Sequence, residues 1–305
     1  MKLLKGKLLE YTADASIITI ALIWGSTFIV MKQGVENIQP ITYLFFRFFF
    51  AAVLMGAIAL PYFRHFSRKM LKDGIILGVY LFLTFFFQVL ALKLTTATEV
   101  GILTGLYVLF VPVLSAVFYK KVPHLFSIIG VVLSAVGMMM ITFHSGMHLS
   151  LGQGFGVINA FFIALYILQV DVYSKKHNVV VLTAIQIATS TVLAGLYALF
   201  FETQPAAPIF EADILYPLIY LSVFATVVCF FVQTAMQKHT TPTKAAIMFT
   251  FEPLSSAFFS YFIGGEVLGL RQYFGAALIV AAILVAEVGT SIRYSMKKPK
   301  IKAQV

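Results

Sequence analysis

The stretch TKAAIMFTFEPLSSAFFSYFIGGE, residues 243–266, decides how the rest of the chain is interpreted. It is long enough to cross a bilayer as a helix, yet an acid and a proline, Glu252 and Pro253, lie near its middle. Proline removes one backbone donor and clashes with the preceding turn, so we expect the helix to kink or break there. A carboxylate at that depth costs a few kcal/mol or more unless it is neutralised, paired or hydrated. The two features together indicate a functional position inside a membrane span.

A second stretch, TEVGILTGLYVLFVPVLSAVFY at 98–119, has a proline at the matching place, Pro112, but Val111 where the acid would be. Each stretch is followed by a short turn and a glycine-bearing helix, with Gly130 corresponding to Gly275 after a few residues of slippage. The two regions therefore look like copies of one unit that have diverged at the functional position.

The composition is that of a membrane protein. Of 305 residues, 60% are hydrophobic and 11% charged, and the mean hydropathy is +0.95, whereas soluble domains are about a quarter charged. The net charge of +10 does not indicate a nucleic-acid partner, because the basic residues form short clusters between apolar runs. The single cysteine, Cys229, excludes an internal disulfide and any cysteine-based metal cluster.

The apolar runs predict ten membrane-spanning helices. They fall near 15–35, 41–61, 74–93, 99–119, 125–143, 152–171, 180–201, 213–236, 243–264 and 271–291. The first run continues through Trp24 without a small-residue cleavage pattern, so we expect a span there and not a signal peptide. Eighteen lysines and arginines fall on the N-terminal side of this topology and three on the other, which predicts a multi-pass protein of the cell membrane with both termini in the cytoplasm.

The topology also predicts the domain organisation. We expect two five-helix repeats, 1–145 and 146–292, followed by a basic cytoplasmic tail, 293–305. Because five is odd, the second repeat enters the membrane in the opposite sense to the first. Inverted repeats with interrupted helices are typical of secondary transporters, whose substrate site lies near the midplane between the repeats. The predicted fold class is therefore an all-α polytopic membrane protein of two inverted repeats.

Four motifs carry a resemblance to a known family. WGSTFIVMKQG (24–34) and the pair Arg47-Phe48 lie in the first two spans, and GQGFGVINAFFIALYIL (152–168) opens the second repeat. The ending FEPLSSAFFSYFIGGEVLGLRQYFGAALIVAAIL (251–284) adds Glu-Pro, Gly-Glu and spaced glycines. In order and spacing they resemble the EamA-like, ten-helix members of the drug/metabolite transporter superfamily. The chain departs from that pattern at YKKVP (119–123), where Gly-Glu is often found.

The resemblance implies a transporter of the cytoplasmic membrane, in most cases an exporter of amino acids or related metabolites. It does not fix the substrate.

Two charged residues at depth are candidates for substrate contact. Glu252 can bind a substrate ammonium group or take up a proton; alternatively it caps backbone groups freed by Pro253 or pairs permanently with a cation. Arg47 can hold a substrate carboxylate; alternatively it extends to the outer interface or forms a fixed pair with Glu252. A zwitterionic amino acid would match the two residues if they face one cavity.

Polar and aromatic residues inside apolar spans complete the predicted pathway. Each must find a partner or face a wet cavity, and interhelical hydrogen bonding is the alternative to ligand contact. Pro112 and Pro253 are predicted as the helix breaks that permit gating. The substrate pathway is predicted to contain Trp24, Arg47, Gln88, Tyr107, Tyr166, Gln169, Gln233 and Glu252.

Several functions are disfavoured by what the sequence does not contain. There is no glycine-rich phosphate loop, no arrangement of residues typical of catalysis, and no metal or cofactor motif. The histidines lie in loops or at helix ends, so any proton coupling falls on carboxylates.

The predicted function is a secondary transporter that exports small metabolites by alternating access, with protons as a candidate coupling ion. The predicted partners are a small-molecule substrate and the lipid bilayer, without nucleic acid. An importer or facilitator in the same fold, and a non-transport scaffold or enzyme, remain as alternatives. Substrate, direction, coupling ion and the choice of monomer or homodimer stay open.

Overall fold

The fold was obtained as a computed structural model, which contains helices and no strands within the residues that it describes. These are residues 2–120, 125–142, 150–203, 209 and 211–265, together with 269–271, 273–275, 277, 278, 281, 282 and 285. Most connections between the helices are short. In chain order the helices are α1 (Lys2–Asn37), α2 (Pro40–Ala59), η1 (Leu60–His65), α3 (Arg68–Leu94), α4 (Ala97–Thr104), α5 (Tyr107–Tyr119), α6 (Leu125–Thr142), α7 (Leu151–Tyr173), α8 (Val179–Phe201), α9 (Ala212–Tyr220), η3 (Leu221–Val228), α10 (Cys229–Met236), η4 (Gln237–His239), α11 (Pro242–Phe249) and α12 (Phe251–Gly264).

Eight helical segments of the described chain are long and apolar enough to cross a membrane. They correspond to the first four predicted spans and to the sixth through the ninth. The fifth, 125–143, is α6, whose apolar stretch is the shorter segment Ile128–Gly137. The tenth, 271–291, lies largely outside the described residues, and those that are described are helical. The prediction of an all-α polytopic membrane protein is thus confirmed. Its ten spans are roughly consistent with the eight candidate spans and one shorter apolar helix of the described residues.

Two spans are interrupted, the one made of α4 and α5 and the one made of α11 and α12. The prediction placed the breaks at Pro112 and Pro253, but each interruption lies further toward the N-terminus, at residues 105–106 and at Thr250. Proline removes the hydrogen bond to the carbonyl four residues earlier and its ring crowds that turn, which accounts for the break at Thr250, three residues before Pro253. The break at 105–106 lies more than four residues before Pro112, at Gly105. Around Leu106 the bonds are of the tighter three-residue type, such as Leu109 N–H to Leu106 O at 2.9 Å.

The two interrupted spans correspond better when they are aligned by their breaks than when they are aligned by their prolines. Both α4 and α11 have eight residues before the interruption. Tyr107 follows the first residue of α4 by ten positions, and Glu252 follows the first residue of α11 by ten as well. The position equivalent to Glu252 is therefore Tyr107, where the sequence alignment on the prolines pointed to Val111.

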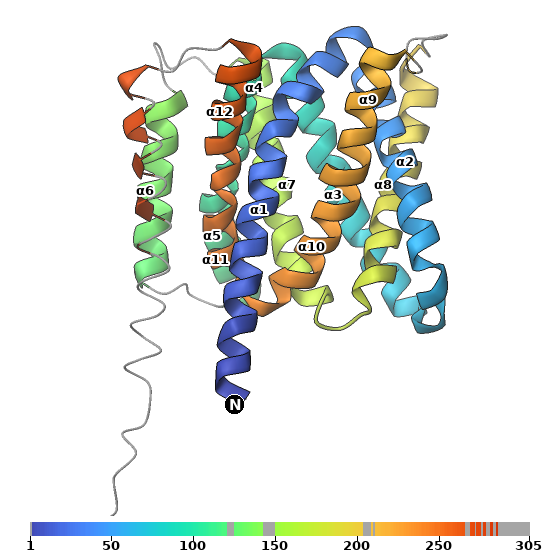
Figure 1. Ribbon diagram of the computed structural model, residues 1–305, viewed down its shortest axis with the longest axis horizontal. Helices are drawn as coiled ribbons and strands as arrows, with labels where there is room; N and C mark the ends of the chain where they lie inside the picture. Colours follow the sequence, from blue (N-terminus) through green and yellow to red (C-terminus); the bar gives the residue numbers. More distant parts are fainter. Residues whose placement is uncertain are drawn as a thin grey trace, which may run out of the picture.

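The helices lie roughly parallel in one bundle, with α6 at one edge and α2 at the opposite edge (Figure 1). The two halves of the chain are interleaved: α1 packs on α12, α2 on α8, and α3 on both α7 and α8. The interrupted spans also lie against each other, with α4 on α12 and α5 on α11. Five passes separate the starts of α1 and α7, so the two halves enter the bundle from opposite sides (Figure 1).

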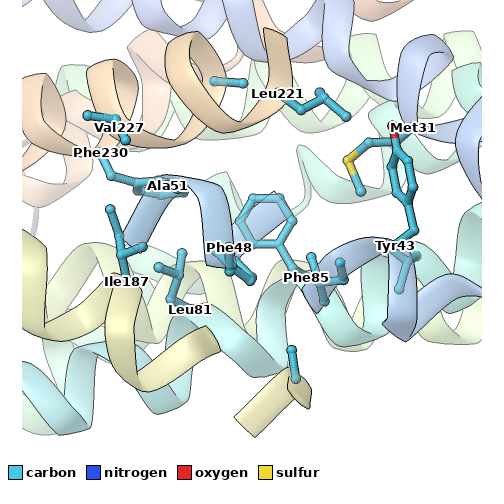
Figure 2. Packing of buried hydrophobic residues seen from close by; sticks show 14 of the residues in the cluster. Met31, Tyr43, Phe48, Ala51, Leu81, Phe85, Ile187, Leu221, Val227 and Phe230 are labelled. Carbon is cyan, nitrogen blue, oxygen red and sulfur yellow. The ribbon is translucent and has the colours of Figure 1, made fainter. Parts of the chain in front are cut away.

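The space between the helices is filled largely by aliphatic and aromatic side chains. In the larger cluster, the rings of Phe48 and Phe85 lie near Leu81, with Leu221 and Val227 of η3 across from them (Figure 2). A second cluster joins α1, α5, α7 and α11. The outer faces also carry large apolar side chains, as expected for helices whose surroundings are lipid.

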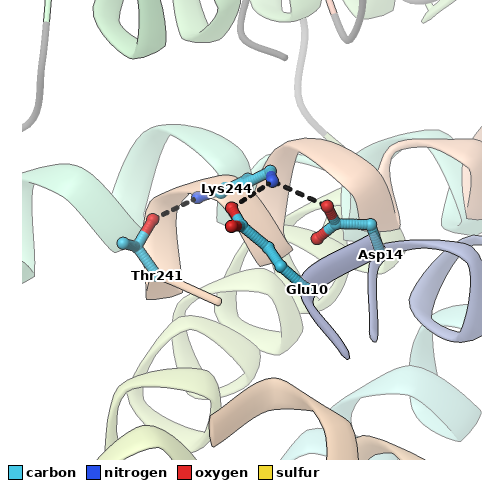
Figure 3. Close-up of polar contacts among 4 residues, drawn as sticks. All are labelled: Glu10, Asp14, Thr241 and Lys244. Carbon is cyan, nitrogen blue, oxygen red and sulfur yellow. Dashed lines mark hydrogen bonds and ion pairs between the residues drawn. The ribbon is translucent and has the colours of Figure 1, made fainter. Parts of the chain in front are cut away.

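One charged cluster joins α1 to α11 on the side of the membrane where α1 begins, here called the N-terminal side. The Lys244 ammonium group lies 3.1 Å from the Glu10 carboxylate and 2.7 Å from that of Asp14 (Figure 3). Thr241 caps α11 by accepting a hydrogen bond from the Lys244 backbone N–H. The Lys244 side chain is only 6% exposed. The cluster ties the first half of an interrupted span to α1.

We expect Lys244→Met to destabilise the protein markedly, because the change removes the buried cation that bonds the Asp14 and Glu10 carboxylates. Removing one partner of a buried ion pair costs about 3–5 kcal/mol. Lys175→Met is the matched control, since Lys175 also bonds an acid, Asp171, but is 48% exposed, and exposed pairs contribute about 1 kcal/mol or less. Thermal unfolding in detergent compares the two. Equal shifts of the midpoint in both variants would contradict the structural role of the cluster.

Candidate functional site

A cavity lies between the two halves of the bundle, at the level of the interrupted spans. Its walls come from α1, α3, α5, α7, α10, α11 and α12, and its volume is about 40 Å³. This space holds a few water molecules, so a larger ligand requires the walls to move apart. The lining residues are Trp24, Thr27, Leu81, Thr84, Phe85, Gln88, Tyr107, Ile163, Tyr166, Ile167, Phe230, Gln233, Phe249 and Glu252.

The cavity brings together six of the eight residues predicted to line the pathway: Trp24, Gln88, Tyr107, Tyr166, Gln233 and Glu252. They come from six different elements, which the sequence alone could not assemble. The other two lie elsewhere. Gln169 donates a hydrogen bond to the Tyr119 hydroxyl at 3.2 Å, and Arg47 is packed behind the cavity wall. Whether any of these residues contacts substrate stays a prediction.

Aromatic rings form much of the wall. Trp24 lies 5.1 Å from Phe230 and 5.5 Å from Phe249 between ring centroids. Phe230 continues the wall to Phe85 at 5.9 Å and to Tyr166 at 5.8 Å, both edge to face. Aromatic faces attract cations as well as apolar groups. The sequence did not single out Phe85, Phe230 or Phe249, because they are three of 31 phenylalanines.

Among the described residues that line the cavity, Glu252 is the only charged one. It is 7% exposed, and its carboxylate has no hydrogen bond or ion pair with any residue that the structure describes. Its span runs from Pro242 to Ile263, so Glu252 lies at the middle of the span, as predicted. It is also in the first turn of α12, where the positive end of the helix dipole favours a negative charge.

A close approach of α1 fixes the backbone of Glu252. A Cβ atom built on Gly25 would lie only 2.6 Å from the Glu252 carbonyl oxygen and would clash with Ser255. Ser255 in turn donates a hydrogen bond to the Leu22 carbonyl at 2.7 Å. Only a residue without a side chain permits this contact, so Gly25 sets the distance between α1 and the start of α12.

Several polar atoms at the cavity have no protein partner. The Tyr107 hydroxyl, the Thr84 hydroxyl and the side-chain carbonyls of Gln88 and Gln233 are buried without a hydrogen bond in the described structure. Buried polar groups are nearly always satisfied by protein, water or ligand. Four such atoms lie in the same cavity wall as the Glu252 carboxylate. The Tyr166 hydroxyl differs, because it donates to Gln186 Oε1 at 2.9 Å.

A π-helical segment, η3, fixes two of the predicted residues from outside the cavity. The Trp24 indole N–H donates to the Ala225 carbonyl at 2.8 Å, and Arg47 Nε donates to the Thr226 hydroxyl at 2.9 Å. The Thr226 hydroxyl itself donates to the Leu221 carbonyl five residues earlier. Such wide turns expose carbonyls to side chains and are frequent at functional sites. Neither helix propensities nor the hydrophobic periodicity of the sequence indicated the π-helical segment η3.

Arg47 is fully buried, which excludes the alternative that it extends to the membrane interface. No ion pair joins it to Glu252, so the alternative of a fixed pair is also wrong for this structure. Its guanidinium lies over the Phe85 ring, with Cζ 4.3 Å from the ring centroid. Phe85 therefore stands between Arg47 and the cavity.

The described residues contain no group of three or more histidine, cysteine or acidic side chains that could hold a metal ion. The side chains that line the cavity are aromatic rings, aliphatic groups, hydroxyls, amides, and one carboxylate.

Comparison with known proteins assigns the family. The model of the EamA-like transporter family matches the chain twice, at residues 12–143 and at 150–287. The chain belongs to the EamA-like transporter family. The double match agrees with two related halves, while the exact domain boundaries predicted above stay a prediction.

Relatives with similar sequences carry the same general description. An uncharacterized transporter of Archaeoglobus fulgidus is 31% identical over 275 residues, covering 90% of this chain and 85% of its own length. The uncharacterized transporter YoaV of Bacillus subtilis is 23% identical, with coverages of 88% and 94%. One solved crystal structure has a TM-score of 0.74 at 17% identity and covers 91% of this chain and 96% of its own, a likeness in fold. The family and these relatives favour a transporter over an enzyme.

Proposed function

We propose that this EamA-family protein is a secondary carrier that exports small metabolites bearing an ammonium group, amino acids or their derivatives, by alternating access. The observation that carries the proposal is the unpaired Glu252 carboxylate in the wall of an aromatic cavity at mid-membrane. A carboxylate removed from water needs a cation or a proton. An ammonium group with an apolar body meets both the charge of Glu252 and the aromatic wall.

Glu252 also supports coupling to protons. A proton and a substrate ammonium group compete for one carboxylate, because either neutralises it and both together give no further gain. If the binding site changes from one side of the membrane to the other only while Glu252 is neutralised, the carrier exchanges one proton for one substrate ammonium group. With the outside more acidic than the cytoplasm, this exchange drives substrate outward.

The basic residues set the proposed orientation. Their excess on the N-terminal side supports a cytoplasmic location for that side. The breaks at residues 105–106 and at Thr250 would act as hinges for α4–α5 and α11–α12. Access from the cytoplasm would require α11 to move away from α1, and hence the cluster of Lys244 with Glu10 and Asp14 to separate.

Counterflow in proteoliposomes tests the proposal. Vesicles loaded with unlabelled compound receive labelled amino acids or nucleotide-related metabolites in pools, at two pH values. We expect saturable, transient accumulation of at least one amino-acid pool, which requires the unlabelled compound inside. Accumulation that does not saturate would indicate a channel. Absence of counterflow for every amino-acid pool would contradict the proposed substrate class.

A further inference from the structure

The connection between α2 and α3 forms an exposed basic and aromatic surface on the N-terminal side, here called the 60–72 surface after its residues. It contains four lysine and arginine residues and no acid. All four cations are exposed, and none forms an ion pair with a residue that the structure describes. They are Arg64, Arg68, Lys69 and Lys72. Like charges that lie close together without counter-charges attract anions.

The same surface places aromatic rings beside the cations. Tyr62, Phe63 and Phe66 are all exposed, and the rings of Phe63 and Phe66 stack at 6.2 Å between centroids. Just before them, the chain presents exposed aliphatic side chains, among them Ile58 and Leu60. Along α2 and η1 the exposed side chains therefore change from aliphatic to aromatic to basic. Because aromatic residues are enriched at membrane–water interfaces, this order places the cations at the level of the lipid headgroups.

The first turns of α3 show the same change in the opposite direction. Arg68 and Lys72 lie on one exposed stripe, since residues four apart share a face of a helix. Leu71 and Ile75 continue this stripe with exposed apolar side chains. The stripe is thus basic where α3 begins and apolar further along the span. The backbone N–H groups and the dipole at the start of a helix also favour an anion.

From this arrangement we infer that the 60–72 surface binds the phosphate of an anionic phospholipid. The phosphate lies at the start of α3, at Arg68 and Lys69, and the acyl chains lie along the exposed aliphatic side chains of α2 and α3. Charge-assisted hydrogen bonds hold the phosphate, and basic residues next to a span attract anionic lipids. The next acid along the chain does not compete, because Asp73 is buried and bonded to His177 at 2.7 Å. The inference does not rest on the proposed function.

Two lysines in the connection between α7 and α8 provide a matched control. They lie on the same side of the membrane as the 60–72 surface, but each already has a partner in the protein. Lys175 bonds the Asp171 carboxylate, and Lys176 lies over the Tyr173 ring, with its Nζ 5.9 Å from the ring centroid. Replacing these two lysines removes as much positive charge from the N-terminal side as replacing Arg68 and Lys69.

Native mass spectrometry of the full-length protein in detergent tests the site. The protein is titrated with phosphatidylglycerol or with phosphatidylcholine of the same acyl chains, and the bound lipids are counted. We expect the wild type to bind its first phosphatidylglycerol at least tenfold more tightly than phosphatidylcholine. Arg68→Gln combined with Lys69→Gln should weaken phosphatidylglycerol binding at least tenfold, because each basic residue beside anionic lipid contributes about fivefold. Phosphatidylcholine binding should not change.

Three comparisons separate a site from the general charge of this side. Lys175→Gln combined with Lys176→Gln should keep the preference for phosphatidylglycerol. Arg68→Lys combined with Lys69→Arg should keep it as well, because both charges remain, and this variant distinguishes loss of charge from damage to the fold. Inorganic phosphate at the concentration of the lipid should not displace phosphatidylglycerol, since it lacks the acyl chains that pack on the apolar side chains.

Equal binding of the two lipids by the wild type would overturn the inference. An equal loss of phosphatidylglycerol in the two double glutamine variants would also overturn it, because the whole basic side and not the 60–72 surface would then attract the lipid. Displacement by equimolar inorganic phosphate would refute a lipid as the ligand. The titration contains no transported substrate, so its outcome is independent of the counterflow experiment.

Discussion

Replacing Glu252 with glutamine is expected to lower substrate counterflow about tenfold or more and to remove its dependence on pH. The amide keeps the shape of the side chain but binds neither a proton nor an ammonium group as a counter-ion. A hydrogen bond to a charged group contributes roughly 1.5–3 kcal/mol, and 1.4 kcal/mol corresponds to about a factor of ten. Counterflow of the identified substrate in proteoliposomes at two pH values measures both effects.

Glu99→Gln is the control for this experiment. Glu99 lies in the first turn of α4, the half-helix that packs against α12, and it is only partly buried. It does not line the cavity, so its replacement should leave counterflow and its pH dependence unchanged. If Glu252→Gln behaves like Glu99→Gln, the carboxylate is not the coupling group and the cavity binds its ligand by other means.

Replacing Gly25 with valine is expected to destabilise the protein strongly and to disturb the cavity at the same time. Any side chain at Gly25 meets the Glu252 carbonyl oxygen and Ser255, and backbone cannot move aside as a flexible side chain can. Overpacking typically costs about 1–3 kcal/mol, and here the shift falls on the first turn of α12. Thermal unfolding measures the loss, and the fluorescence of the adjacent Trp24 reports the change at the cavity.

Gly56→Ala is the matched control for Gly25. A Cβ at Gly56 meets no atom within 4 Å, and alanine favours a helix over glycine by up to about 1 kcal/mol. This variant should therefore be at least as stable as the wild type. If Gly25→Val unfolds at the same temperature as Gly56→Ala, the close packing of α1 on α12 does not hold the site together.

The fold could be predicted because membrane spans leave a strong local signal. Apolar runs of spanning length and the uneven distribution of lysine and arginine gave the fold class and the spans. The breaks were predicted at the prolines themselves, whereas they lie nearer the N-terminus, at residues 105–106 and at Thr250. The correspondence of Tyr107 with Glu252 appeared only when the half-helices α4 and α11 were aligned by their starts.

The candidate site could be predicted where a residue type is rare in its surroundings. Glu252, Trp24 and the glutamines Gln88 and Gln233 stand out in apolar spans, and the structure places all four at one cavity. Phe85 and Phe230 could not be chosen from so many phenylalanines. The depth of a residue along a helix does not show which face of the helix it occupies. Arg47 was therefore predicted to line the pathway, whereas its guanidinium lies over the Phe85 ring, behind the cavity wall.

Movement of protons with substrate tests the central claim most directly. Proteoliposomes containing a pH-sensitive dye receive the substrate found by counterflow from outside. Exchange of an entering substrate cation for a proton bound at Glu252 predicts that the lumen becomes alkaline, with an amplitude that follows substrate concentration and vanishes in Glu252→Gln. Substrate entry without any change of luminal pH would contradict the proposed exchange of proton and substrate at one carboxylate.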